Sequence, residues 1–211
     1  MVRVIAGQAG GIRLKTPPGS STRPTSDRVK EAMFNILSDV IPGANVLDLF
    51  SGCGALGIEA LSRGAEHAVF VDSDRQCCRI IAANLTAAGC FGKARVICRD
   101  ALNVLTNMKG RPFDALSRPF DLVLMDPPYH KGLAAEALRI LFQPVSDSRA
   151  DSRPDREAGP SLLSPDAWIC IETAADEGLP EMPGFPALHT RRKYGNILLN
   201  FYICNDSSAN V

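Results

Sequence analysis

The chain has 211 residues, and 23 Lys and Arg balance 23 Asp and Glu, so the formal net charge is zero. This length suits one well-cored domain with a small appendage, and the zero charge excludes a global field that would draw the protein onto nucleic acid or a membrane. Seven cysteines without a C-x-x-C pair exclude the common zinc and disulfide frameworks. The N-terminus lacks a signal-peptide core and no run could cross a bilayer, so we predict a soluble cytoplasmic protein with no metal and no membrane partner.

Residues 1–43 form an N-terminal block of distinct character. Residues 2–16 hold two short alternating runs around glycines, which predicts a β-hairpin, and residues 26–38 place apolar side chains at helical spacing. The block carries six Lys and Arg against three Asp and Glu, so we expect a phosphate-binding surface for RNA; a solvated face without a partner is the alternative. The cations predicted to bind RNA are Arg13, Lys15, Arg23, Arg28 and Lys30, with Arg191 and Arg192 as a second cluster near the C-terminus.

Strands alternate with helices from residue 44 onward. Apolar runs at 45–50, 67–72, 94–100 and 120–126 are separated by helical patterns, and a fifth run follows at 168–173. This rhythm predicts a parallel sheet covered by helices on both faces. The last run, 196–204, follows another strand-like stretch with no helix between, so we expect a terminal antiparallel hairpin. We assign residues 44–205 to one α/β domain, with a flexible insertion at 143–161 and a disordered tail at 206–211.

The loop after the first of these strands has the pattern G-x-G-x-x-G, formed by Gly52, Gly54 and Gly57. Glycines here permit a tight turn and let a ligand reach the backbone, while the following helix offers free N–H groups. A strand-to-helix turn that only requires glycine is the alternative. The next strand ends in Asp72, 18 residues after Gly54, and an acid at that place can accept hydrogen bonds from both hydroxyls of a ribose.

NAD and S-adenosylmethionine (SAM) both carry such a ribose, so other residues must separate the two cofactors. Asp48 lies four residues before Gly52, where a carboxylate would repel the pyrophosphate of NAD but suit the ammonium and sulfonium groups of SAM. SAM is therefore the predicted cofactor, with S-adenosylhomocysteine as the product. Asp100, which ends the third strand, either accepts a hydrogen bond from the adenine amino group or caps the helix that follows.

The fourth strand ends in D-P-P-Y, the residues Asp126, Pro127, Pro128 and Tyr129. The prolines lack an N–H and fix φ, so they end the strand in a rigid turn beside the expected methyl donor. Asp126 and the Pro127 carbonyl would accept the two N–H groups of a base amine and direct its lone pair at the methyl carbon, while Tyr129 stacks on the base. The alternative is a structural turn in which Tyr129 only packs. Glu172, at the end of the fifth strand, is interpreted as structural.

Four segments in chain order resemble the bacterial 16S rRNA guanine-N2 methyltransferases of the RsmD type: RVIAGQAGGIRLKTPPG, TRPTSDRVKEAMFNIL, DLFSGCGALGIEALSRGA and DPPY. The resemblance runs from about residue 3 to 203. It implies a Rossmann-like class I SAM-dependent methyltransferase fold with sheet order 3-2-1-4-5-7-6, acting on one guanine of 16S rRNA in an assembling small subunit, without an obligate protein partner. It also implies that the loop from Asp48 to Gly57, including Ser51, holds SAM together with Asp72, and that Asp126 to Tyr129 hold the guanine.

Three alternatives use the same residues. An adenine-N6 DNA methyltransferase would share the D-P-P-Y chemistry, but such enzymes usually carry a large target-recognition region, and little of this chain is unassigned. A non-catalytic RNA-binding assembly factor is disfavoured by the intact Asp126 and Tyr129, and a nicotinamide oxidoreductase is disfavoured by Asp48.

Overall fold

The computed structural model describes residues 2–18, 26–108, 118–142, 162–179, 186 and 188–204. Within these ranges the helices are α1 (Asp27–Ile36), α2 (Ala55–Ser62), α3 (Arg75–Ala87), α4 (Ala101–Met108) and α5 (Leu133–Phe142), with one 3-10 turn at Phe91–Lys93. The strands are β1 (Val2–Arg3), β2 (Arg13–Leu14), β3 (Asn45–Leu49), β4 (His67–Asp72), β5 (Ala94–Cys98), β6 (Phe120–Met125), β7 (Leu163–Ala174), β8 (Leu188–Tyr194) and β9 (Ile197–Ile203). The predicted insertion at 143–161 and the predicted tail at 206–211 lie outside the described residues.

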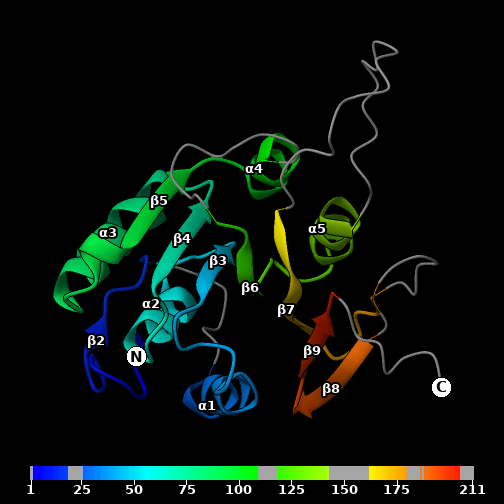
Figure 1. Cartoon of the computed structure of the whole chain (residues 1–211), viewed down its shortest axis with the longest axis horizontal. Helices are drawn as coiled ribbons and strands as arrows, with labels where there is room; N and C mark the ends of the chain where they lie inside the picture. The colour runs from blue at the N-terminus through cyan, green and yellow to red at the C-terminus, as the bar shows by residue number, and fades with distance from the viewer. Residues whose placement is uncertain are drawn as a thin grey trace.

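Seven strands form one sheet in the order β5-β4-β3-β6-β7-β9-β8 (Figure 1). Strands β5, β4, β3, β6 and β7 are parallel, whereas β9 runs antiparallel to both β7 and β8. Numbered from β3, this order is 3-2-1-4-5-7-6, so the predicted methyltransferase sheet and its terminal hairpin are confirmed. The small β1–β2 hairpin at the N-terminus is confirmed as well.

Helices cover both faces of the sheet and bury its strands. One apolar core joins α1, α2 and α3 to one face, and a second joins α4 and α5 to the other (Figure 1). All five residues of β3 are buried, as expected for a central strand covered on two sides. Among the described helices, none is long and apolar enough to cross a bilayer.

The N-terminal hairpin is anchored to α2 through a buried carboxylate. Glu59 is fully buried, and its carboxylate accepts hydrogen bonds from the backbone N–H groups of Ile5 (2.7 Å) and Ala6 (3.0 Å). The same group forms ion pairs with Lys30 of α1, at 3.3 Å, and with Arg63, at 2.8 Å. The N-terminal residues are therefore fixed to the core of the sheet domain.

Lys30 consequently does not belong to an RNA-binding surface, and that prediction was wrong. Its side chain is 1% exposed, and its ammonium donates to the Arg3 carbonyl as well as pairing with Glu59. The physical reason is its position on α1, where it shares the inner face of the helix with Met33 and Phe34. Its charge serves the hairpin anchor instead of a phosphate.

Candidate functional site

The two predicted motifs follow neighbouring strands at the same edge of the sheet. The glycine loop begins after β3, and the D-P-P-Y turn begins after β6. These strands pair in parallel, with Leu49 opposite Met125 at their carboxyl ends. The register therefore brings the two motifs together at the carboxyl ends of the strands (Figure 1). In parallel sheets, ligands bind at this edge.

The glycine loop has a backbone that few other residues could adopt. Gly52 and Gly54 have φ of +55° and +80°, and Gly54 stands at the N-cap of α2. Gly57 fills a different need, because a Cβ there would lie 2.3 Å from the Phe70 ring and 2.9 Å from the Asp48 carboxylate. Phe50 also has a positive φ, of 58°, directly after β3. A non-glycine residue held in that region stores backbone strain, and such strain often lies at functional sites.

Asp48 lies beneath the glycine loop. Its side chain is buried, and its Oδ2 accepts a hydrogen bond of 2.8 Å from the Gly57 N–H. Burial raises the pKa of this carboxyl from 3.8 to about 7; the Gly57 bond opposes the rise and the charge of Asp72 adds to it. The contact shows that Asp48 holds the loop against the start of α2. Direct contact with a cofactor stays a prediction.

Asp72 and Ser51 tie the loop to β4. Asp72 is half-buried, and its carboxylate accepts from the Gly52 N–H and the Asp74 N–H, each at 2.8 Å. Burial raises its pKa, although these two hydrogen bonds oppose the rise. The Ser51 hydroxyl donates to the Asp48 carbonyl at 2.6 Å and accepts from the Val71 N–H at 3.0 Å. Both predicted residues are therefore part of the loop's scaffold at the end of β4.

Asn84 of α3 connects the loop to the N-terminal block, a link that the sequence did not predict. Its side chain is buried, and its amide donates to the Cys53 carbonyl and to the Lys15 carbonyl, each at 2.9 Å. Its oxygen accepts from the Lys15 N–H at 2.8 Å. One side chain thus binds the end of β2 and the glycine loop together.

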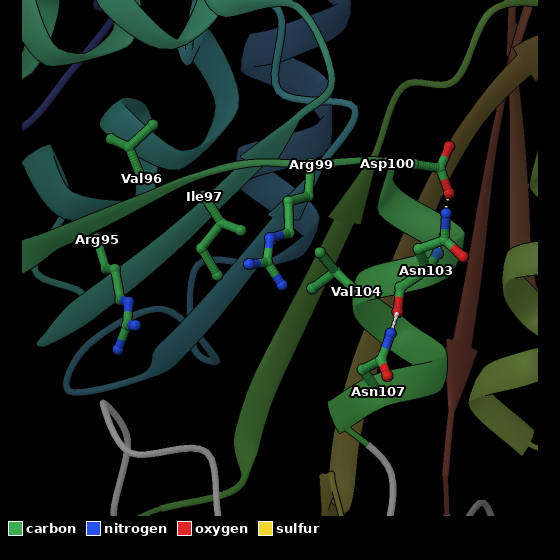
Figure 2. Close-up of a pocket in the computed structure, with 8 residues that line it drawn as sticks. All are labelled: Arg95, Val96, Ile97, Arg99, Asp100, Asn103, Val104 and Asn107. Atoms are coloured by element: carbon green, nitrogen blue, oxygen red, sulfur yellow. Dashed lines mark hydrogen bonds between the residues drawn. The ribbon is translucent and has the colours of Figure 1, made fainter.

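Asp100 caps α4, as one of its two predicted roles required. Its Oδ1 accepts a 2.9 Å hydrogen bond from the Asn103 N–H. The residue also lines a cavity of about 500 Å³ between β5 and α4 (Figure 2). Contact with an adenine amino group stays a prediction. The cavity is lined by Arg95, Val96, Ile97, Arg99, Asp100, Asn103, Val104 and Asn107.

The D-P-P-Y turn holds a tyrosine in a fixed place. Pro127 is buried, and Asp126, Pro128 and Tyr129 are half-buried after the last residue of β6. The Tyr129 hydroxyl donates a 2.6 Å hydrogen bond to Oε1 of Glu172, a fully buried residue of β7. Burial raises the pKa of Tyr129, and the Glu172 carboxylate raises it further. The sequence did not predict this contact, although Glu172 ends its apolar run as Asp126 does.

The remaining predicted cations lie on the surface. Arg13 and Lys15 are exposed at β2, and Arg28 is exposed on α1. Arg191 and Arg192 are exposed on β8, where the Arg191 guanidinium also donates to Asn200 of β9 at 2.7 Å. Arg23 lies outside the described residues. Across the described part of the chain, no group of three His, Cys, Asp or Glu side chains is arranged to hold a metal ion.

Comparison with known proteins identifies the family. The family model described as conserved hypothetical protein 95 matches residues 2–149. Ribosomal RNA small subunit methyltransferase D of Escherichia coli is 34% identical over 201 residues, which cover 95% of this chain and 89% of that protein. The chain belongs to this methyltransferase family. A second member, the putative rRNA methyltransferase YlbH of Bacillus subtilis, is 34% identical and covers 92% of this chain and 94% of its own length.

Solved structures agree with the family assignment. The putative methyltransferase yhhF from Escherichia coli superposes with a TM-score of 0.73 at 34% identity, covering 96% of this chain and 97% of that one. An RNA methyltransferase from Salinibacter ruber, in complex with S-adenosyl-L-homocysteine, shares the fold with a TM-score of 0.59 at 16% identity, covering 87% and 95% of the two chains. The Rossmann-like methyltransferase fold predicted from the motifs is confirmed.

Proposed function

We propose that this protein transfers a methyl group from SAM to the exocyclic N2 amine of one guanine of 16S rRNA, in the small ribosomal subunit or its precursor. The observation that carries the proposal is the register of β3 and β6, with Leu49 opposite Met125. It places a loop suited to a cofactor beside a turn suited to a base amine. The family of named rRNA small subunit methyltransferases supports the choice of substrate.

The residues of the loop fit SAM. Open space surrounds the position where Gly52 would carry a Cβ, so a ligand can approach the backbone there. The half-buried carboxylate of Asp72 lies next to that backbone and would accept hydrogen bonds from the ribose hydroxyls. SAM supplies the electrophilic methyl group when bound. Asp48 holds the glycine loop against the start of α2 through its hydrogen bond with Gly57. The proposed reaction uses no metal.

The D-P-P-Y turn would position the guanine. Asp126 and the Pro127 carbonyl accept the two N–H hydrogens of the N2 amine, so its lone pair points at the methyl carbon. Bound SAM would supply the methyl group to this amine and would be left as S-adenosylhomocysteine, and the methylated amine would release one proton to water. The ring of Tyr129 stacks on the base, which must leave its helix to reach this edge.

The exposed cations of the two clusters would bind the phosphate backbone around the target. Arg13, Lys15 and Arg28 belong to the N-terminal block, residues 1–43, which we propose is an RNA-binding extension. Arg191 and Arg192 lie on β8, the outermost strand of the seven-stranded sheet. The proposed guanine site follows β6, and β7 and β9 separate that strand from β8 in the sheet (Figure 1).

Methyl transfer to small ribosomal subunits tests the proposal. The protein should transfer labelled methyl from SAM to subunits from cells that lack this enzyme. Asp126→Ala should lose the transfer and keep its affinity for SAM, whereas Glu66→Ala, at an exposed glutamate before β4, should keep both. Equal labelling of duplex DNA would favour the adenine-N6 DNA methyltransferase alternative. Undiminished transfer by Asp126→Ala would overturn the proposed chemistry.

A further inference from the structure

We propose that Glu172 is a positioning residue for methyl transfer. It holds the ring of Tyr129 in the orientation in which the ring stacks on the guanine. This inference rests on the proposed function. It assigns a role to a buried acid of β7 that the D-P-P-Y motif does not contain. Glu172 acts through Tyr129 and touches neither the base nor the methyl donor in this proposal.

The contact has the geometry of a strong hydrogen bond. The Tyr129 Oη and the Glu172 Oε1 are 2.6 Å apart, within the range of charge-assisted O–H···O⁻ bonds. Glu172 is 0% exposed, so water does not compete for this acceptor. A carboxylate is costly to bury unless hydrogen-bond donors face it, and the tyrosine hydroxyl is one such donor. The pair therefore joins the turn after β6 to the core of β7.

The strand register explains why these groups meet. Strands β6 and β7 run parallel, with Met125 opposite Ile171. Glu172 is the next residue of β7, and Asp126 is the first residue after the end of β6. Side chains alternate along a strand, so Glu172 extends toward the face covered by α1, α2 and α3, where Cys170 also lies. The acid that holds the tyrosine thus belongs to the strand next to the one that the D-P-P-Y motif follows.

The hydrogen bond restrains a side chain of the turn that the backbone leaves free to rotate. Pro127 and Pro128 fix the chain before Tyr129, and His130 follows with a positive φ of 58°. A tyrosine in that frame can still rotate about its side-chain torsions. Anchoring the hydroxyl holds the far end of the ring, so its face is already oriented when the base arrives. Orientation of this kind contributes to rate because reacting atoms must meet within a narrow geometry.

The donor keeps its proton under the conditions of the reaction. Burial raises the pKa of Tyr129, and Glu172 and Asp126 add to the rise, in that order. The hydroxyl therefore remains a donor across the working pH range, and the ring stays neutral. A neutral ring is suited to stacking against a base beside the carboxylate of Asp126.

Kinetics of four variants test the role: Tyr129→Phe, Glu172→Leu, Glu172→Gln and the double variant Tyr129→Phe/Glu172→Leu. Tyr129→Phe and Glu172→Leu each remove the bond, and we expect about a 10- to 100-fold loss of kcat/KM for the ribosomal substrate, the range of a hydrogen bond to a charged group. The double variant should be no slower than Glu172→Leu, because the same bond is lost once. Glu172→Gln should recover part of the rate, because its amide oxygen still accepts from the hydroxyl.

Affinity for S-adenosylhomocysteine, measured by calorimetry, separates positioning from general damage. It should stay within about twofold in every variant that transfers more slowly, whereas a merely structural role would lower this affinity and the melting temperature together. Glu136→Gln, which removes a half-exposed carboxylate paired with Arg139 on α5, is the matched control. If Glu172→Leu does not fold, Tyr129→Phe alone decides the question.

The experiments distinguish a failure of the positioning role from a failure of the proposed function. If the unmodified protein transfers methyl but Tyr129→Phe keeps the full rate, the positioning role is wrong and the proposed function stands. The same holds if the single losses multiply in the double variant, since independent effects require no shared bond. If the unmodified protein does not methylate ribosomal RNA, the proposed function fails, and the role of Glu172 fails with it.

Discussion

Replacement of Glu59 by alanine tests whether the buried carboxylate on α2 holds the N-terminal hairpin. This group accepts from the N–H groups of Ile5 and Ala6 and pairs with Lys30 and Arg63. Its removal strands the Lys30 ammonium in the core, and breaking a buried pair costs about 3–5 kcal/mol. A domain of this size loses about 2–4 °C in Tm per kcal/mol, so we expect Glu59→Ala to lower the Tm by about 6–20 °C. Thermal unfolding followed by circular dichroism measures the change.

Glu66→Ala is the matched control for this experiment. Glu66 pairs with Arg118 at the surface, where both side chains are more than half exposed, and such pairs contribute about 0–1 kcal/mol. Adding Lys30→Met to Glu59→Ala should restore part of the loss, because the stranded charge is then absent. Equal Tm values for Glu59→Ala and Glu66→Ala would refute the reasoning.

Two further predictions concern the glycine loop. The pKa of Asp48 is raised from 3.8 to about 7 in the folded protein, so its contribution to the free energy of unfolding is present at low pH and is lost as the pH rises. Urea unfolding should show the unmodified protein losing stability relative to Asp48→Asn between about pH 4 and pH 7, and parallel profiles would contradict this. Gly57→Ala should lower stability by about 1–3 kcal/mol through its clash with Phe70, whereas Gly92→Ala, with open space around it, should not; equal Tm values would argue against the clash.

The sequence predicted most of the fold because local patterns of apolar and turn residues determine where the helices and strands lie. The alternation of apolar runs and helical spacing located β3 to β7, and turn residues between strand-like stretches located the β8–β9 hairpin. The order of the strands is a different kind of information. Pairing joins segments far apart in the chain, so it came from the resemblance of motifs to a family and was then confirmed.

The prediction of the site succeeded where one segment of the chain carries the functional residues. It was incomplete where residues from two distant segments interact. The glycine loop and the D-P-P-Y turn each lie within a few residues, so spacing was enough to find them. The bond from Tyr129 to Glu172 spans 43 residues, and the ion pair from Lys30 joins two different helices. Charge suggested that Lys30 was exposed, but its helical spacing with Met33 and Phe34 indicated the buried face.

The double attachment made by Asn84 affects the order in which the chain folds during synthesis. The end of β2 is complete when residue 15 has been made, but the amide that holds it comes 69 residues later. At roughly 5–20 residues per second, the N-terminal block waits several seconds for this partner. The same side chain donates to the Cys53 carbonyl, so the predicted RNA-binding block and the predicted cofactor loop both lack this shared contact until α3 has been made.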